Sequence, residues 1–158
     1  MTNWLTAEEQ ASWRAWIAAS TLLPDRLSRD LVDEAGMTLA DYEILMYLSE
    51  SPQRRMRMSE LAVATLSSRS RLSHQVDRLE QAGLVSREPC SDDRRGAFAV
   101  LTAAGWQTVV ETAPLHVESV RRRLVDVLTP EEFAELGRLC GVIAERLGDP
   151  TSAECDGG

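Results

Sequence analysis

The chain has 158 residues, of which 44% are hydrophobic and 27% charged, and its formal net charge is −8 at pH 7. A chain of this length forms a single domain that buries roughly 70% of the surface exposed in the unfolded state, and its apolar content argues against intrinsic disorder. No apolar run approaches the ~20 residues of a membrane-spanning helix. The opening residues, MTNWLTAEEQ, lack the basic and apolar regions of a signal peptide, so we expect a cytoplasmic protein.

Few groups in the sequence are suited to catalysis or metal binding. The cysteines Cys90, Cys140 and Cys155 are odd in number and widely spaced, which favours neither a disulfide framework nor a CxxC motif. We interpret them as incidental or structural thiols, and Cys90, near Arg94 and Arg95, is the one candidate for a reactive thiol. There are two histidines, no glycine-rich phosphate loop and no nucleophile beside a base, so the sequence predicts no enzyme, no metal site and no cofactor.

The charges are unevenly distributed along the chain. Residues 54–99 carry nine arginines and six acidic residues, a net charge of +3, whereas residues 1–53 and 100–158 carry net charges of −6 and −5. All 17 basic residues are arginine, whose planar fork matches phosphates and base edges. Genome composition can also produce an all-arginine chain, so it is the placement of the arginines that points to nucleic acid.

Two helices are predicted in the acidic N-terminal part. The first begins at the capping box Thr6-Ala7-Glu8-Glu9, is expected to kink or restart at Pro24, and ends at Gly36. The second opens at Thr38 and ends at Pro52. The residues expected to be buried in this second helix are Tyr42, Leu45, Met46 and Leu48.

The basic middle predicts two more helices and a hairpin. Residues Ser59–Ala64 form a short helix, TLSS (65–68) is a turn, and SSRSRLSHQVDRLEQAG (67–83) is a longer helix. The residues of this longer helix that face inward are Leu72, Val76 and Leu79. The runs LVSREPC (84–90) and AFAVLT (97–102) then predict a two-stranded hairpin around the charged turn SDDRRG.

Two long helices follow the hairpin. One starts at Thr102, with an expected kink at Pro114. The other starts at Thr129-Pro130-Glu131-Glu132, where threonine caps the helix and proline occupies its first position. The apolar stripe of this last helix consists of Phe133, Leu136, Leu139, Ile143 and Leu147. We expect the polar tail, residues 149–158, to fray.

This order of elements describes a mainly α fold with a small β-hairpin wing, which is a winged helix-turn-helix. The segment MSELAVATLSSRSRLSHQVDRLEQAGLVSREPCSDDRRGAFAVLTAAG (58–105) resembles the MarR family of bacterial transcriptional regulators. The resemblance rests on Asp93-x-Arg95-Gly96 followed by Leu101-Thr102 and Gly105, and on VDRLEQAGLVSR (76–87). The helix order matches over essentially the whole chain.

The resemblance implies a single domain over residues 1–148, with a DNA-binding lobe at about 38–101, dimerisation helices at 1–36 and 102–148, and a flexible tail at 149–158. It implies a homodimer bound to a pseudo-palindromic operator in double-stranded DNA, with half-sites about one helical turn, ~10 bp, apart. Family members often bind small aromatic or phenolic acids, so we expect a repressor released by such a ligand. The peroxide-sensing branch uses a cysteine near the start of the first helix, which this chain lacks.

Angular positions on the helix at 67–83 give the expected DNA contacts. The residues expected at base edges are Ser68, Ser70, Arg71 and His74, and those expected at phosphates or in internal salt bridges are Arg69 and Arg78. We expect Asp77 to pair with an arginine, because phosphate repels it. His74 and Gln75 occupy positions that vary in the family and set the choice of DNA sequence. A polar surface helix without such a role is the alternative.

The charged turn of the hairpin carries the other expected contacts. The resemblance places Arg95 in the minor groove, where a narrow groove has an enhanced negative potential. Asp93 would then orient Arg95, and Arg94 would take a phosphate. On the residues of the hairpin alone, the turn also fits a solvated loop whose acids and bases neutralise one another.

An effector pocket and a second function remain open at this point. The candidates to line a pocket are Trp13, Trp16, Tyr42 and Met46, and ordinary core or dimer packing is the alternative for each. The acidic balance of the chain also permits a winged-helix module that binds protein and not DNA. Salt separates these two functions, because DNA binding through phosphates weakens steeply as salt rises.

Overall fold

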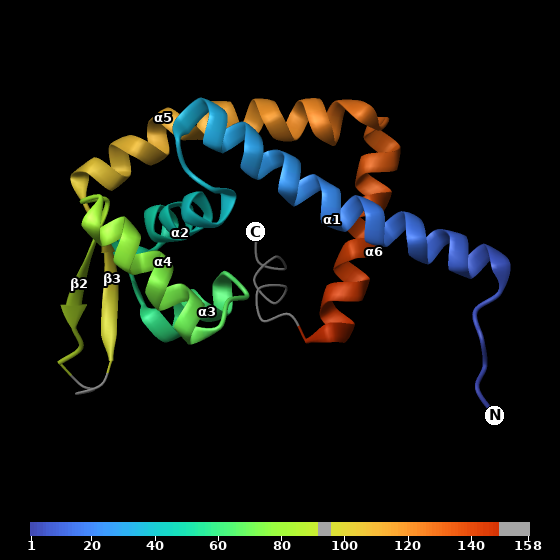
Figure 1. Ribbon diagram of the computed structural model, residues 1–158, viewed down its shortest axis with the longest axis horizontal. Helices are drawn as coiled ribbons and strands as arrows, with labels where there is room; N and C mark the ends of the chain where they lie inside the picture. Colours follow the sequence, from blue (N-terminus) through green and yellow to red (C-terminus); the bar gives the residue numbers. More distant parts are fainter. Residues whose placement is uncertain (92–95, 149–158) are drawn as a thin grey trace.

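The computed structural model describes residues 1–91 and 96–148. This part of the chain is mainly helical with a small antiparallel sheet, as predicted. Its helices are α1 (Ala7–Ala35), α2 (Leu39–Glu50), α3 (Met58–Ala64), α4 (Arg69–Gln81), α5 (Ala103–Arg123) and α6 (Pro130–Leu147). Its strands are β1 (Arg55–Arg57), β2 (Val85–Pro89) and β3 (Ala97–Leu101), and two short 3-10 helices are η1 (Pro52–Arg54) and η2 (Val125–Val127). Helices α2, α3 and α4 and the sheet form a lobe at one end, and α6 and the first half of α1 lie at the other (Figure 1).

The core of the molecule lies in this lobe. Side chains from α2, α3, α4, the sheet and the start of α5 pack together and are almost fully buried. They include Ile44, Leu45, Leu48, Leu61, Leu72, Val76, Leu79, Val85, Ala99, Leu101 and Val109. The inward face predicted for α4 is therefore confirmed. In α2, Met46 is only half-buried, so its predicted burial was wrong, and the prediction missed Ile44.

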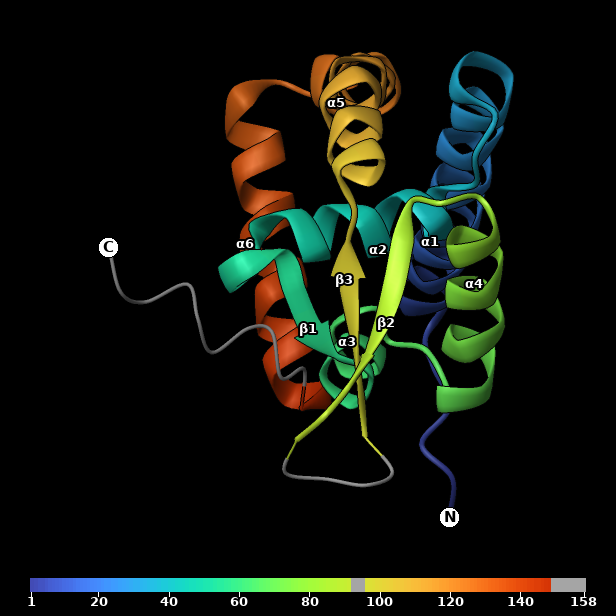
Figure 2. The same ribbon diagram turned by 90° about the vertical axis from the view of Figure 1, so that its left-hand side faces the viewer.

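The sheet has three strands in the order β1-β3-β2, all antiparallel, so the prediction of a two-stranded hairpin was incomplete (Figure 2). Arg55 pairs with Val100 and Arg57 with Phe98 across β1 and β3. Strand β1 has only the residues Arg-Met-Arg, too few to show an alternating apolar pattern. Its extended conformation is stabilised by pairing with β3, which follows more than forty residues later in the chain.

Both long helices run through an internal proline. Helix α1 is continuous through Pro24, so the alternative that the helix restarts there was wrong, and α5 is continuous through Pro114. Helix α1 is capped at both ends as predicted, by the capping box of Thr6 and Glu9 and by Gly36 with φ of 70°. In Figure 1, α5 bends between its yellow and orange parts.

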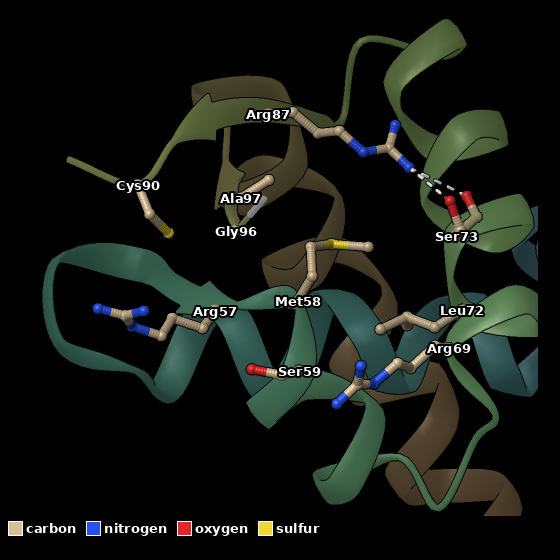
Figure 3. Close-up of a pocket in the computed structure, with 10 residues that line it drawn as sticks. All are labelled: Arg57, Met58, Ser59, Arg69, Leu72, Ser73, Arg87, Cys90, Gly96 and Ala97. Carbon is tan, nitrogen blue, oxygen red and sulfur yellow. Dashed lines mark hydrogen bonds between the residues drawn. The ribbon is translucent and has the colours of Figure 1, made fainter. Parts of the chain in front are cut away.

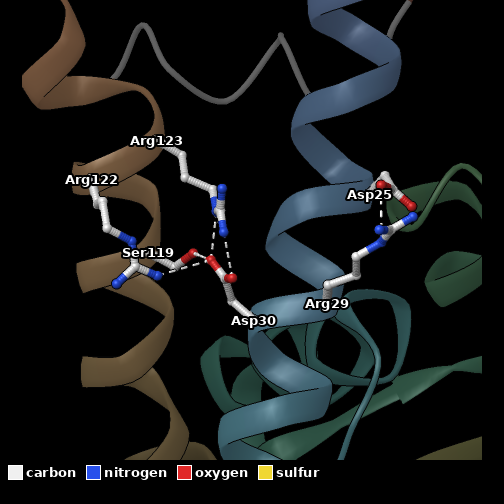
Figure 4. Close-up of polar contacts among 6 residues, drawn as sticks. All are labelled: Asp25, Arg29, Asp30, Ser119, Arg122 and Arg123. Atoms are coloured by element: carbon white, nitrogen blue, oxygen red, sulfur yellow. Dashed lines mark hydrogen bonds and ion pairs between the residues drawn. The ribbon is translucent and has the colours of Figure 1, made fainter.

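A cluster of ionic hydrogen bonds joins α1 to the C-terminal end of α5 (Figure 4). Asp30 of α1 accepts two hydrogen bonds from Arg123, each 2.6 Å long, and one of 3.1 Å from Arg122. The Ser119 hydroxyl donates to the same carboxylate. These donors, Arg123 first among them, hold the pKa of Asp30 well below its usual range. The neighbouring pair of Asp25 and Arg29, 3.2 Å apart, is exposed.

Strand β3 passes into α5 through one residue, Thr102, which caps the helix. The Thr102 hydroxyl accepts a hydrogen bond of 3.0 Å from the Gly105 amide and donates one of 2.7 Å to the carbonyl of Gly83. Gly105 packs so closely that a Cβ atom there would overlap the Leu84 carbonyl oxygen and the Leu101 side chain. The helix can start beside the sheet only because this residue is glycine.

The far end of the molecule leaves a large apolar surface uncovered. Helix α6 begins at the predicted cap, Thr129, but buries none of its residues within the described chain. The exposed apolar residues of α1, α5 and α6 include Trp13, Trp16, Ile17, Leu22, Val117, Phe133, Leu139, Val142 and Ile143. No helix in residues 1–91 and 96–148 is long and apolar enough to cross a membrane.

Candidate nucleic-acid interface

Helix α4 presents the predicted contact residues on its outer face. Ser68 is the N-cap, and its hydroxyl accepts a hydrogen bond of 3.2 Å from the Arg71 amide. Because Leu72, Val76 and Leu79 face the core, the opposite side of the helix is open to solvent. The six predicted contact residues, Ser68, Arg69, Ser70, Arg71, His74 and Arg78, are all exposed.

The arginines of this face differ in their partners. Arg78 forms an ion pair of 2.9 Å with Asp41 of α2. This is the internal salt bridge that was one of the two roles expected for Arg78. Arg69 and Arg71 form no ion pair with any residue in the described ranges. The first turn of α4 therefore carries two guanidinium charges that no carboxylate in this part of the structure neutralises.

Arg87 connects β2 to α4. It forms ion pairs of 2.8 Å with both Asp77 and Glu80, so the predicted pairing of Asp77 with an arginine is confirmed. It also donates a hydrogen bond of 3.1 Å to the carbonyl of Ser73 (Figure 3). Glu80 accepts a further bond of 3.0 Å from the Arg87 amide. These contacts fix the angle between the wing and α4.

Gln75 does not share the outward position of His74. Its side chain is 6% exposed, and its Oε1 atom has no hydrogen-bond partner among the described residues. The residue lies between Leu72 and Leu79 on the inner side of α4, so its side chain is not presented to solvent as that of His74 is. Adjacent residues differ by about 100° around a helix, so Gln75 and His74 face different directions although they are neighbours in the sequence.

The tip of the wing, with Asp93, Arg94 and Arg95, lies outside the described residues. Just beyond the ends of the strands that lead to it, the Cys90 amide donates a hydrogen bond of 3.1 Å to the Gly96 carbonyl. Figure 2 shows these strand ends on the same side of the lobe as the connection between α3 and α4. A duplex that contacts the first turn of α4 on this side therefore also passes the wing.

A cavity of about 560 Å³ lies between α3, α4 and the sheet. Arg57, Arg69 and Arg87 are among the residues that line it (Figure 3). Cys90 also lines it and is buried, whereas a reactive thiol needs exposure, so the structure does not favour the reactive role considered for Cys90.

Sequence analysis missed a second set of basic residues on β1. The guanidinium groups of Arg55 and Arg57 lie 3.9 and 5.4 Å from the centre of the Phe98 ring, and Arg55 pairs with Glu88 at 3.2 Å. The signal was present in the run RRMR, but its place beside the wing depends on a strand pairing that local sequence does not reveal.

The four residues proposed for an effector pocket occupy different environments. Trp13 and Trp16 are 54% and 41% exposed on α1. Tyr42 is buried in the lobe, where its ring lies 4.9 Å from that of His116, and Met46 is half-buried. The single chain thus leaves both tryptophans open to solvent and does not enclose them.

Two short helices joined by a turn and followed by an antiparallel wing define this protein as a winged helix-turn-helix protein. The family model described as "MarR family" matches residues 35–96. The transcriptional regulator PecS of Dickeya dadantii is 30% identical over 131 residues, which cover 80% of this chain and 76% of PecS. The chain belongs to the MarR family of transcriptional regulators.

Two solved structures from Streptomyces coelicolor are similar over nearly the whole chain. AbsC, a MarR family transcriptional regulator, is 53% identical with a TM-score of 0.86, covering 92% of this chain and 98% of AbsC. Sco3205, also a MarR family regulator and solved in complex with DNA, is 49% identical with a TM-score of 0.90, covering 96% and 94%. Both of these relatives are regulators of transcription.

Proposed function

We propose that this regulator binds double-stranded DNA in a sequence-specific manner, with α4 in the major groove. The observation that carries the proposal is the first turn of α4, where Arg69 and Arg71 have no ion-pair partner in the described structure. Uncompensated guanidinium groups on the outer face of such a helix match phosphates and guanine edges. Sco3205, which is 49% identical to this chain, was solved in complex with DNA, and this supports DNA binding by the present protein.

Each of the six predicted contact residues has a role in this proposal. Ser68, Ser70, Arg71 and His74 contact base edges, and Arg69 and Arg78 contact phosphates. Arg78 keeps Asp41 as its partner, so its guanidinium is already oriented when a phosphate approaches. In the wing, Arg95 enters the minor groove, Asp93 orients it and Arg94 takes a phosphate.

The proposed assembly is a homodimer. The uncovered apolar surface of α1, α5 and α6 has no role in a lone chain, and a second copy would bury it. Residues 1–36 and 102–148 are then the dimerisation region, and residues 38–101 the DNA-binding lobe. A two-fold axis presents two α4 helices to half-sites about one turn, ~34 Å, apart on a pseudo-palindromic operator.

Release by a small aromatic or phenolic acid completes the proposal of a repressor. Tyr42 and Met46 lie on α2, between the distal helices and α4, and Trp13 and Trp16 lie on the uncovered part of α1. A ligand held among them in the dimer would favour one spacing of the two lobes over another. A panel of phenolic acids, scored by melting shift and by DNA release, tests this part. If no acid produces either effect, the pocket is refuted.

The central experiment is binding to duplexes selected from a random pool. The wild type should bind with an affinity that falls as salt rises, with a log-log slope of about −0.9 per phosphate contacted. Arg71→Ala should weaken binding without lowering the melting temperature. Arg138→Ala is the control, because Arg138 lies on α6 and pairs with Glu135 at 2.7 Å. Weak binding that is equal for all three proteins would favour the winged-helix module that binds protein.

A further inference from the structure

The turn between α3 and α4 contains a leucine in a conformation that suits glycine. Leu66 has φ of 50°, in the left-handed region that non-glycine residues rarely adopt. The Leu66 amide donates to the Val63 carbonyl at 3.0 Å, and the Ser67 amide donates to the Ala62 carbonyl at 2.9 Å. This is the Schellman arrangement that ends a helix, and Leu66 occupies the position where glycine is preferred.

The leucine side chain lies outside the core of the fold. It is 78% exposed, and Val63, one helical turn earlier, is 51% exposed. Both line a hollow of about 550 Å³ whose rim includes Ser68 and Arg69, the first residues of the candidate interface. An apolar side chain that is strained by its backbone and left in water contributes to neither core nor turn, so its contribution lies in what it contacts outside the chain.

The position of the hollow favours DNA as its occupant. It is continuous with the first turn of α4, the part of a recognition helix that lies deepest in the groove. Arg69 on its rim has no carboxylate partner in the described ranges and attracts a polyanion. The apolar group that the major groove displays is the 5-methyl group of thymine.

We propose that Leu66, with Val63 beside it, contacts the 5-methyl group of a thymine in each half-site. This inference rests on the proposed function. The polar residues of α4 read hydrogen-bonding groups, and Leu66 adds a preference that depends on a methyl group alone. Leu66 is then a specificity-determining residue outside the recognition helix.

A cycle of protein and DNA changes tests the contact. The duplex is one selected by the wild type, and each thymine is replaced in turn by deoxyuridine, which removes only the methyl group. Leu66→Asn keeps a residue that tolerates the left-handed conformation but removes the apolar surface. We expect one deoxyuridine position per half-site to cost the wild type about fourfold in affinity, the value of burying one methyl group. Leu66→Asn should cost a similar factor on the thymine duplex and show no further loss at that position.

Two further variants separate binding from stability. Leu66→Gly should raise the melting temperature, because glycine relieves the backbone, while lowering affinity for the thymine duplex. Gln53→Gly is the matched control, since Gln53 also has a positive φ, of 56°, but lies outside the hollow. It should leave DNA affinity unchanged.

The possible results are distinguishable. If both Leu66 variants bind as the wild type does, or lose the same factor on every duplex including the deoxyuridine ones, the methyl contact is wrong although the proposed function stands. If the wild type binds no selected duplex in a salt-dependent manner, the proposed function and this inference fail together.

Discussion

Arginine side chains in this protein divide into two groups by their partners. Arg78, Arg87 and Arg123 each contact at least one carboxylate, whereas Arg69 and Arg71 contact none within the described residues. The sequence predicted which arginines face outward on α4, because helical periodicity decides that. It left open whether Arg78 is paired, because Asp41 lies on another helix and only the tertiary fold brings the two together.

Asp30 should contribute to stability through its charge. Its pKa is lowered in the folded state, chiefly by Arg123, so its contribution is complete above the usual pKa of 3.8 and is lost as pH falls through the lower folded value. Asp30→Asn should lower the melting temperature at pH 7 by about 5 °C and flatten the acid side of the stability profile. Asp25→Asn removes one partner of an exposed ion pair and should change the melting temperature at pH 7 by at most about 1–2 °C. Equal effects of the two substitutions would contradict the role assigned to Asp30.

His116 should make the protein less stable in mild acid. Burial lowers its pKa, and its Nδ1 has no hydrogen-bond partner among the described residues. The unfolded chain therefore takes up a proton near pH 6.5 before the folded one does, and stability falls as pH drops below that value. His116→Phe, which preserves the ring contact with Tyr42, should remove this loss, worth at most about 1.4 kcal/mol per pH unit. Urea unfolding at pH 7.5 and 5.5 and fixed protein concentration measures it, and an unchanged pH dependence would refute the assignment.

Elements whose ends carry local signals were predictable from sequence. Helices α1, α2, α4, α5 and α6 are capped by hydroxyl side chains that accept a hydrogen bond from the amide three residues later, namely those of Thr6, Thr38, Ser68, Thr102 and Thr129. This interaction is local, so a short stretch of sequence is enough to predict it. Strand β1 was not predictable, because its hydrogen bonds are made with β3 far along the chain. The burial of Gln75 was also missed, since a polar residue beside an apolar stripe has no local signal of its own.

Gly105 should be among the least replaceable residues at the junction of the sheet and α5. A methyl group there would overlap the Leu84 carbonyl, which is backbone and cannot rotate away. Gly105→Ala should destabilise the protein by roughly 3 kcal/mol, although alanine favours a helix, because the strand and the helix must separate. Gly137→Ala is the control, since nothing lies within 4 Å of its added Cβ atom, and it should be neutral or stabilising. Chemical denaturation compares them, and equal stabilities would show that the junction can adjust.

The whole molecule is a packed lobe with a long, largely uncovered helical extension. The core residues are concentrated around α2, α3, α4 and the sheet, while α6 buries none of its residues within the described chain. The amphipathic stripe of α6 was predictable from sequence, but the sequence could not show that this stripe would find no partner within its own chain. That result comes from the fold, and it supports the homodimer already expected from the sequence.

Disrupting the stripe of α6 should separate the proposed dimer. Leu139→Arg places a charge in the apolar surface, so sedimentation at micromolar concentration should show a monomer. DNA affinity should fall by at least about 100-fold, because two linked half-site contacts become independent. Glu145→Arg adds an arginine on the polar side of the same helix and should leave a dimer. A wild type that sediments with the mass of one chain would refute the dimer outright.

The single residue between β3 and α5 has a consequence for the geometry of the operator. Because Thr102 is the single residue between β3 and α5, the lobe is connected rigidly to the start of α5. The number of residues in α5 therefore sets how far the lobe is rotated about the helix axis relative to the distal end of α5. One inserted residue would turn the distal surface by about 100° relative to the lobe, and seven would bring it back to within about 20° but some 10 Å farther away. In the proposed dimer, the number of residues in α5 therefore determines how many base pairs separate the two half-sites. A protein with a longer or shorter α5 would need an operator with a different spacing.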